Sequence, residues 1–234
     1  MAIDPAVANS TSTVSYGSRS NTAPAAPAGI AAGQFALLGL YTEGNVAVTV
    51  PTGCTLIVNV DDANTDGDLF LAYKRVTGSE TEFAWTHATA STEAWVKLLT
   101  GVVTSGDPED AVRSTANPIY GAGPITLPAI SAANAGSLIC GYVCRYSGGT
   151  WSSPSLTSRI SQAQEILMAD VQAGSGDTGA KTVTWTGSDN SWGVLFAIKA
   201  EPAGGASLTP TVGAGTLAGI AGRMDLGVLT QTEI

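Results

Sequence analysis

Residues 191–199 read Ser-Trp-Gly-Val-Leu-Phe-Ala-Ile-Lys, and a proline follows at position 202. The large apolar side chains of this stretch (Trp, Val, Phe and Ile) recur at every second position, so they point to one face of a strand. The residues between them are small or apolar, which predicts a strand that is covered on both faces. Because proline cannot donate to a sheet ladder, pairing should stop at Pro202. We therefore expect the folded body to end there.

The composition favours a β-rich body and argues against some partners. Hydrophobic residues make up 44% of the chain and charged residues only 12%, with 28 Gly and 11 Pro. This balance suits antiparallel sheets with many turns and disfavours a helical bundle. The net charge is −9, and Lys74-Arg75 is the only adjacent basic pair. Nucleic acid and anionic membranes both attract clustered Lys and Arg, so neither is expected as a partner.

Short apolar or alternating runs recur between residues 35 and 199, and turn residues separate them. Only Glu165–Gln172 is ambiguous between strand and helix, and residues 102–128 contain so many Gly and Pro that we expect a long connection there. Regularly spaced short strands predict an all-β sandwich or barrel. The predicted strands cover residues 35–41, 46–50, 56–60, 69–76, 83–85, 94–98, 138–145, 165–171, 182–185 and 191–199.

The two ends of the chain differ from the body. Residues 1–30 are rich in Ser, Thr, Ala and Pro, which predicts an extended N-terminal arm in which residues 12–16 add as an edge strand. The predicted sandwich domain covers residues 31–202. Residues 203–234 form a Gly/Ala/Thr-rich tail, which is either disordered or a strap that docks on another surface. We assign its assembly contacts to seven spaced apolar residues: Leu208, Val212, Leu217, Ile220, Leu226, Val228 and Leu229.

The three cysteines do not suggest a disulfide framework. Cys140 and Cys144 share one face of a predicted strand but lie roughly 13 Å apart, at about 3.3 Å per residue. A disulfide needs Cα atoms within about 7 Å, so these two cannot bridge each other. We expect buried thiols that act as small hydrophobic groups. The alternative is that Cys54 pairs with one of the other two.

The first residues, Met-Ala-Ile-Asp-Pro, lack the basic start and the apolar run of a secretory leader. No window approaches the 18 or so apolar residues of a membrane span. We therefore expect a protein that is made and folded in a cytoplasm.

Several short stretches stand in a characteristic order along the chain, and the first reads Pro-Ala-Gly-Ile-Ala-Ala-Gly at residues 27–33. This order resembles landmarks of a group of tailed-phage and prophage virion proteins, although Gln34 stands where the family usually has Asp and Cys54 where it usually has Trp. The resemblance implies a β-sandwich, often jelly-roll-like, carried on the virion as a decoration, collar or tail-fibre component. It implies copies of the chain and other virion proteins as partners, and no catalytic residue is carried over. The matching stretches are residues 27–38, 50–56, 69–76, 98–102, 173–179, 196–202 and 208–217.

One loop has the pattern of the first half of a calcium loop. Asp62, Asn64 and Asp66 supply oxygen ligands at alternate positions, and Gly67 follows where such loops turn sharply. The glutamate expected at the twelfth position is Tyr73 here, so Asp68 or Asp61 would have to replace it. The alternative is an Asx-rich hairpin turn. Calcium is the one metal cofactor that the sequence suggests.

The sequence favours a protein that is not an enzyme. Its single histidine, His87, is expected to be exposed at a strand end, and no Gly-x-Ser-x-Gly motif supplies a nucleophile. One histidine and three cysteines lack the close spacing of a zinc site. Two carboxylate pairs, Glu80/Glu82 and Glu109/Asp110, lie in predicted loops with no sign of a cleft.

A second function remains open beside the structural one. The loop Tyr-Ser-Gly-Gly-Thr-Trp at residues 146–151 places Tyr146 and Trp151 near a predicted turn, where aromatic rings stack on sugar faces. The alternative is that these rings only pack against the body. The leading hypothesis is a structural virion protein that assembles through its terminal arms. The alternative is a tail-fibre adhesin or carbohydrate-binding module that recognises polysaccharide on the host surface.

Overall fold

The protein folds as an all-β antiparallel sandwich. We describe a computed structural model of the whole chain, which describes Ile3 and residues 11–61, 67–110, 113–119, 123–146, 150–153, 155–186 and 190–202. These residues form strands, turns and bends but no helix. The chain divides into two units after Gly204, and the described residues all belong to the first. The fold class predicted from the sequence is therefore confirmed.

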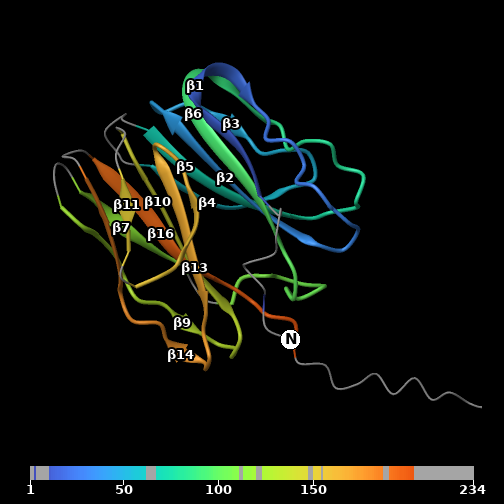
Figure 1. Cartoon of the computed structure of the whole chain (residues 1–234), viewed down its shortest axis with the longest axis vertical. Coiled ribbons are helices and arrows are strands. Elements are labelled where there is room, and N and C mark those ends of the chain that lie inside the picture. Colours follow the sequence, from blue (N-terminus) through green and yellow to red (C-terminus); the bar gives the residue numbers. More distant parts are fainter. Residues whose placement is uncertain are drawn as a thin grey trace, which may run out of the picture. The chain divides into compact units, whose positions relative to one another are not determined.

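The first sheet comes from the first half of the chain, and its strands run from blue to green in Figure 1. All neighbouring strands are antiparallel, and the short strand β3 (Val48–Thr49) pairs with β6 beside the main path. Its order is β1 (Thr11–Thr22), β6 (Trp85–Leu99), β2 (Phe35–Glu43), β5 (Gly67–Arg75) and β4 (Thr55–Asp61).

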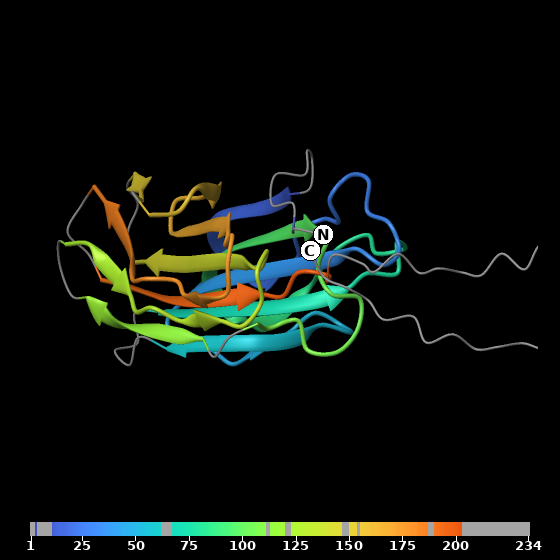
Figure 2. The same ribbon diagram turned by 90° about the horizontal axis from the view of Figure 1, so that it is seen from below.

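The second sheet comes from the second half, and two small sheets accompany it. Its order is β12 (Ser158–Ser161), β13 (Glu165–Val171), β10 (Leu138–Arg145), β16 (Ser191–Ile198) and β7 (Ser114–Ile119). The small sheets are β11 (Trp151–Ser152), β15 (Lys181–Trp185) and β8 (Ile125–Leu127), and the pair β14 (Gly176–Asp177) and β9 (Ser131–Ala132). The long strands of the two main sheets run along nearly the same line in Figure 2. Because each main sheet uses one half of the chain, the finer jelly-roll expectation does not follow from this order.

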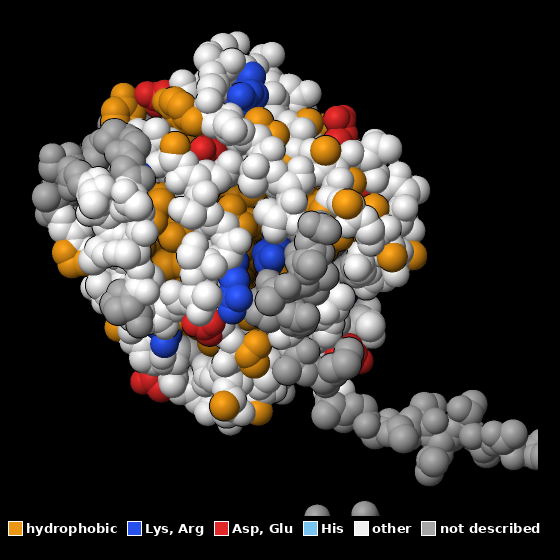
Figure 3. Space-filling model, viewed as in Figure 1, with side chains coloured by type: hydrophobic (Ala, Val, Ile, Leu, Met, Phe, Trp, Pro, Cys, Tyr) orange, Lys and Arg blue, Asp and Glu red, His pale blue; other side chains and the backbone are white. Residues whose placement is uncertain are grey.

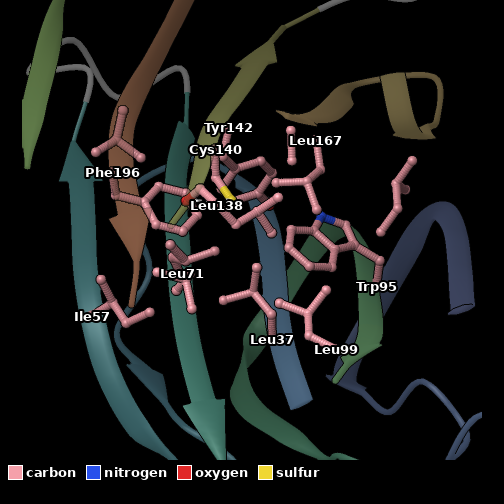
Figure 4. Close-up of a cluster of buried hydrophobic side chains, with 14 of the residues drawn as sticks. Leu37, Ile57, Leu71, Trp95, Leu99, Leu138, Cys140, Tyr142, Leu167 and Phe196 are labelled. Atoms are coloured by element: carbon pink, nitrogen blue, oxygen red, sulfur yellow. Dashed lines mark hydrogen bonds between the residues drawn. The ribbon is translucent and has the colours of Figure 1, made fainter. Parts of the chain in front are cut away.

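The main core lies between the two sheets. Side chains of both sheets interdigitate there, as Figure 4 shows for Leu37 and Leu71 facing Leu138 and Phe196. The Trp95 indole of the first sheet meets the Tyr142 ring of the second edge to face, with ring centroids 5.2 Å apart. Both side chains are fully buried, which joins the sheets at their centre.

Both main sheets are also covered on their outer faces. The small sheet β11-β15-β8 covers the second sheet and encloses an apolar cluster that includes Leu195 and Ala197. A third cluster covers the outer face of the first sheet and includes Leu38 and Phe70. The other face of β16 lies in the central core, where it contributes Trp192, Val194, Phe196 and Ile198. The prediction of a strand covered on both faces is confirmed.

Part of the predicted N-terminal arm packs on the chain's own body. Within residues 1–30, β1 pairs with β6, which confirms the predicted edge strand at residues 12–16 and extends it to Thr22. The Ala26 N–H then donates to the Thr81 carbonyl at 2.8 Å, and Ile30 packs on the outer cluster of the first sheet. These contacts cover apolar surface that the sheet would otherwise expose.

The strand pairing also decides two further expectations about secondary structure. The predicted long connection over residues 102–128 contains β7 and β8, because its backbone pairs with strands that come much later in the sequence. The ambiguous segment Glu165–Gln172 is the strand β13, paired on both sides by β10 and β12. Turn residues broke the periodicity in the first case, and in the second tertiary pairing decided between helix and strand.

Candidate functional site: a polar seam between the two sheets

A polar seam lies between β1, at the edge of the first sheet, and the turn that joins β12 to β13 in the second. It encloses a hollow of about 460 Å³. This volume falls within the range of about 300–1,000 Å³ that is typical of ligand sites. The residues that line the polar seam are Thr13, Ser15 and Tyr16 from β1, Glu93 from β6, and Ser161, Gln162 and Ala163 from the turn region.

Glu93 lies at the inner wall of the polar seam and is only 2% exposed. Its carboxylate accepts hydrogen bonds from the backbone N–H groups of Ala163 at 3.2 Å and Gln164 at 2.7 Å. Burial raises the pKa of Glu93, and these N–H groups oppose part of that shift. A side chain of the first sheet thereby holds the turn of the second.

A second carboxyl group, Glu165, lies deeper and is fully buried. Tyr142 donates its hydroxyl to one carboxyl oxygen, and the Gln162 amide donates to the other at 2.7 Å. The same Gln162 amide also donates to the Ala94 carbonyl of β6 at 3.2 Å. Burial raises the pKa of Glu165 well above its ordinary value, and the charge of Glu93 raises it further.

The arrangement indicates what these two carboxyl groups do. Each oxygen of Glu93 and Glu165 accepts a hydrogen bond from the protein itself. The bonds to Glu93 and the Gln162–Ala94 bond cross from one sheet to the other, and those to Glu165 hold Gln162 in place within the second sheet, so together they fix how the sheets lie against each other. Their geometry favours a structural clasp over proton transfer to a bound molecule.

The rim of the polar seam carries the exposed Tyr16, which binds a carboxylate. The Tyr16 hydroxyl donates to Glu43, at the end of β2, with an O–O distance of 2.6 Å. Hydrogen bonds from Tyr16, Ser91 and Tyr146 lower the pKa of Glu43, with that from Tyr16 contributing most. Tyr16 is 37% exposed and Tyr146 is 40% exposed. The Tyr16 ring also lies against Tyr41, with centroids 6.4 Å apart, and this contact orients it.

The two aromatic residues predicted to bind glycan lie in different surroundings. Tyr146 is 40% exposed, as a residue that contacts a ligand would be. Trp151 is 9% exposed, with the Arg145 guanidinium over its ring at 4.3 Å and the Trp185 ring 5.9 Å away. Its ring is therefore packed into the body, as the alternative expectation held, and its indole N–H donates to the Gln162 carbonyl at 3.2 Å.

Most of the predicted calcium loop lies outside the described residues. These are Asp62, Asn64 and Asp66, and only Asp68 is described. Asp68 is 2% exposed and pairs in register with Asp61 where β4 and β5 adjoin, so the loop connects a hairpin. Within the part of the chain that the structure describes, no three His, Cys, Asp or Glu side chains gather as a metal site would require.

The expectation of an exposed His87 is wrong. His87 lies inside β6 and is 6% exposed, because β1 and β3 pair with this strand over the same region. Its Nε2 is 2.9 Å from the Thr22 hydroxyl, and its Nδ1 is 2.7 Å from the Ala88 carbonyl. His87 therefore stabilises the pairing of β1 with β6.

The carboxylate pairs seen in the sequence have separate partners. Glu80 forms an ion pair with Lys74 at 3.0 Å, and Glu109 forms one with Arg113 at 3.0 Å. Asp110 accepts hydrogen bonds from the Ser137 hydroxyl and from Asn134. These contacts hold loops in place. The carboxyl groups that the fold does bring together, Glu93 and Glu165, were not predicted.

All three cysteines are free thiols, as the sequence predicted. Cys140 and Cys144 are buried in the central core, and burial raises the pKa of Cys140 far above its ordinary value. Cys54 is partly buried, and burial raises its pKa to about 11. All seven predicted tail contacts, from Leu208 to Leu229, lie outside the described residues.

Comparison with known proteins adds no relative. No family model, no curated protein and no solved structure matches the chain. The described residues contain no helix long and apolar enough to cross a membrane.

Proposed function

We propose that this protein is a non-enzymatic structural component on the exterior of a tailed-phage particle, which assembles through its C-terminal tail rather than through both terminal arms, because β1 pairs with the chain's own β6. The sequence landmarks shared with virion proteins support the location. As decoration, collar or tail-associated protein it would bind other virion proteins and copies of itself. The observation that carries the assembly role is an apolar hollow at the end of the sandwich where the described body stops.

The body is tied down up to its last residues. The Lys199 N–H donates to the Pro108 carbonyl at 2.7 Å, and the Glu201 N–H donates to the Gly101 carbonyl at 2.6 Å. Glu201 also accepts from the Thr104 N–H at 2.8 Å. Hydrogen bonds therefore anchor the described body up to residue 201, and the proposal gives the assembly role to residues 203–234.

The apolar hollow lies beside these last residues. It has a volume of about 330 Å³, and Phe35, Leu99 and Val102 are among the residues that line it, with Glu201 at the same site. A space of this size accepts one or two aliphatic side chains. The tail carries seven such side chains, spaced along a Gly-rich backbone.

In the proposed assembly, the tail of one copy places its Leu, Val and Ile side chains on a neighbouring subunit, with the apolar hollow as one receptor. Burial of each side chain contributes roughly 1.5–3 kcal/mol. Seven of them offset much of the entropy lost when the tail is ordered. Repetition of this contact between copies builds a ring or lattice, the usual form of homo-oligomers.

The test uses the full-length chain. One variant replaces all seven apolar tail residues, Leu208 to Leu229, with Ser, and a matched control replaces Thr209, Thr211 and Thr216 with Ser. Light scattering after size exclusion should find oligomers for the wild type and the control but monomers for the seven-residue variant. All three should melt at the same temperature. Equal assembly of all three proteins, or a monomeric wild type, would contradict the proposal.

A further inference from the structure

We propose that residues 226–232 of one copy add as a strand to the open edge of β1 in a neighbouring copy. This inference rests on the proposed assembly role and names the surface that the last part of the tail uses. Three observations on the described body carry it: an edge strand without protection, an arginine at that edge without an ion pair, and a hollow beside it.

The first observation is that β1 is an open edge of the first sheet. Its only strand partner among the described residues is β6, so about every second backbone N–H and carbonyl of its 12 residues points away from the sheet. The strand contains no proline and no lysine, which commonly block such an edge. Two register shifts bend β1, and the Ser15 carbonyl accepts from the Arg19 guanidinium at 3.0 Å. The other outward groups are available to an added strand.

The three other edges of the two main sheets are protected. On β4, the Ile57 carbonyl accepts a hydrogen bond from Arg113. The strand β7 contains Pro118, and β12 is only 4 residues long. Bonded carbonyls, proline and short length all hinder the addition of a strand. Of the edges of the main sheets in the described body, β1 is therefore the one that favours an added strand.

The tail contains a segment that suits this edge. Residues 226–232 read Leu-Gly-Val-Leu-Thr-Gln-Thr, with no charge, no proline and a single glycine. Such a composition favours an extended strand. Residues 203–225 contain a proline and six glycines, so they suit a flexible connection. A Gly-rich connection of 23 residues spans about 25–30 Å on average, which is enough to reach a neighbouring copy.

Arg19 supplies charge complementarity for the end of this segment. Its guanidinium donates to the Ser15 carbonyl and to the carbonyl and hydroxyl of Thr92, all of which are neutral groups. Among the described residues no Asp or Glu forms an ion pair with it. On the face shown in Figure 3, Lys and Arg occur at scattered points rather than as a patch. In the tail, Glu233 follows the strand-forming segment directly, and in the proposed pairing it lies beside Arg19.

The apolar hollow gives the direction of the added strand. Leu99 lines that hollow, and Lys97, two residues earlier on β6, pairs with Thr11 at the start of β1. A tail that has placed a side chain in the apolar hollow therefore meets the start of β1 first. The added strand runs in the same direction as β1 and reaches Arg19 with Glu233.

The added strand also finds partners for its side chains. In the register that joins Glu233 to Arg19, Leu229 comes beside Ser15, which lines the hollow of about 460 Å³ at the polar seam. Val228 comes beside Val14, which packs on the outer apolar cluster of the first sheet. Because successive side chains point to opposite faces, Leu229 enters the polar seam and Val228 extends that cluster. The main chain supplies affinity, and these two side chains supply the register.

The experiment exchanges the two charges in the full-length protein. Arg19→Glu and Glu233→Arg should each raise the dissociation constant of the assembly by roughly two- to tenfold, because an exposed ion pair becomes a repulsion. The variant that carries both changes should return to the wild-type value. Sedimentation equilibrium measures all of these constants. Lys181→Glu on β15 is the matched control, since it changes the net charge as Arg19→Glu does but lies outside β1.

A second measurement keeps Arg19 and locates the strand. One copy carries Ser18→Cys and another carries Thr232→Cys, and the two are mixed under mild oxidation. Neighbouring strands lie about 4.8 Å apart, which is within reach of a disulfide. We expect a disulfide between the two copies. Ser152→Cys, at an exposed position of β11, replaces Ser18→Cys in the control and should form much less.

The outcomes separate this inference from the assembly role. A monomeric wild type, or normal assembly of the variant with seven serines in the tail, contradicts the assembly role and the inference with it. If that tail variant loses assembly, the inference alone is overturned by either of two results. One is a double charge variant that stays as weak as Arg19→Glu. The other is Ser18→Cys forming no more disulfide with the second copy than Ser152→Cys does.

Discussion

The centre of the sandwich and its polar seam join the same two sheets by different means. At the centre, apolar side chains such as Phe196 and Trp95 interdigitate with full burial. At the polar seam, the buried carboxylate of Glu93 accepts hydrogen bonds across the gap from the turn of the second sheet, and the Gln162 amide donates across it to the Ala94 carbonyl. Apolar burial is non-directional and does not depend on pH, whereas hydrogen bonds to carboxyl groups depend on both geometry and protonation. We infer that the centre supplies most of the stability and the polar seam supplies the relative placement of the sheets.

The largest effect is expected at the centre. Phe196→Ala should lower the free energy of unfolding by about 3–5 kcal/mol, because a buried ring leaves a cavity that its neighbours fill only in part. Val171→Ala, which truncates a side chain that is 38% exposed, should change it by less than about 0.5 kcal/mol. Urea unfolding of both variants measures the difference. Similar losses in the two would show that the central cluster is not the main source of stability.

A second prediction concerns how tightly the centre is packed. Gly39 in β2 lies against the Trp95 indole, and a Cβ at this position would overlap the ring. Gly39→Ala should therefore cost about 1–3 kcal/mol, as overpacking does. Gly174→Ala is the matched control, since nothing lies within 4 Å of the added Cβ there. Thermal melting compares the two variants. If the Gly39→Ala protein were as stable as the control, the close approach of Gly39 to the Trp95 indole would be contradicted.

The polar seam should show its own pH dependence. Glu165 has a folded pKa raised above its ordinary value of 4.5, so its contribution to stability is fully present below pH 4.5 and is lost as pH rises through the folded pKa. Glu165→Gln cannot ionise and keeps a hydrogen-bonding side chain of the same size. Urea unfolding at pH 4.5, 6 and 8 should show the variant gaining on the wild type as pH rises. Parallel stability curves for the variant and the wild type would contradict the raised pKa of Glu165.

A carboxylate outside the polar seam should behave in the opposite way, with a smaller effect. Burial raises the pKa of Glu80, but hydrogen bonds from Thr77 and Lys74 outweigh it and lower that pKa to about 2. Its contribution is therefore present above pH 4.5 and is lost as pH falls toward 2. Glu80→Gln should flatten the stability curve in that window only. If Glu80→Gln changed the free energy of unfolding only above pH 5, the lowered pKa of Glu80 would be contradicted.

Periodicity predicted the central strands because both of their faces are buried. The stretches Phe35–Tyr41 and Ser191–Lys199 are apolar at alternate or consecutive positions. This pattern can be read from the sequence without knowing which strands pair with them. The strand β7 was missed because it lies in a stretch broken by Gly and Pro. Its pairing with β16 is a long-range contact that no local pattern reveals.

The polar seam was missed for a related reason. Glu93 lies inside β6 and Glu165 begins β13, and each stands directly before an apolar run, so a carboxyl group next to a buried run was the available signal. Their meeting depends on how the two sheets stack, which one strand's periodicity does not contain. His87 was misplaced because β1, which buries it, comes from a segment that composition assigned to an arm. The hydrogen bond between Tyr16 and Glu43 was missed as well, because it joins strands that are distant in the sequence.

The central claim is that the body is complete at Pro202 and that the residues after it act on another subunit. A density map of the assembled full-length protein tests this most directly. The account predicts density for Leu208 to Leu229 on a neighbouring copy, with one side chain in the hollow beside Phe35, Leu99 and Val102. Tail density packed on its own body, or no ordered tail in the assembled particle, would contradict it.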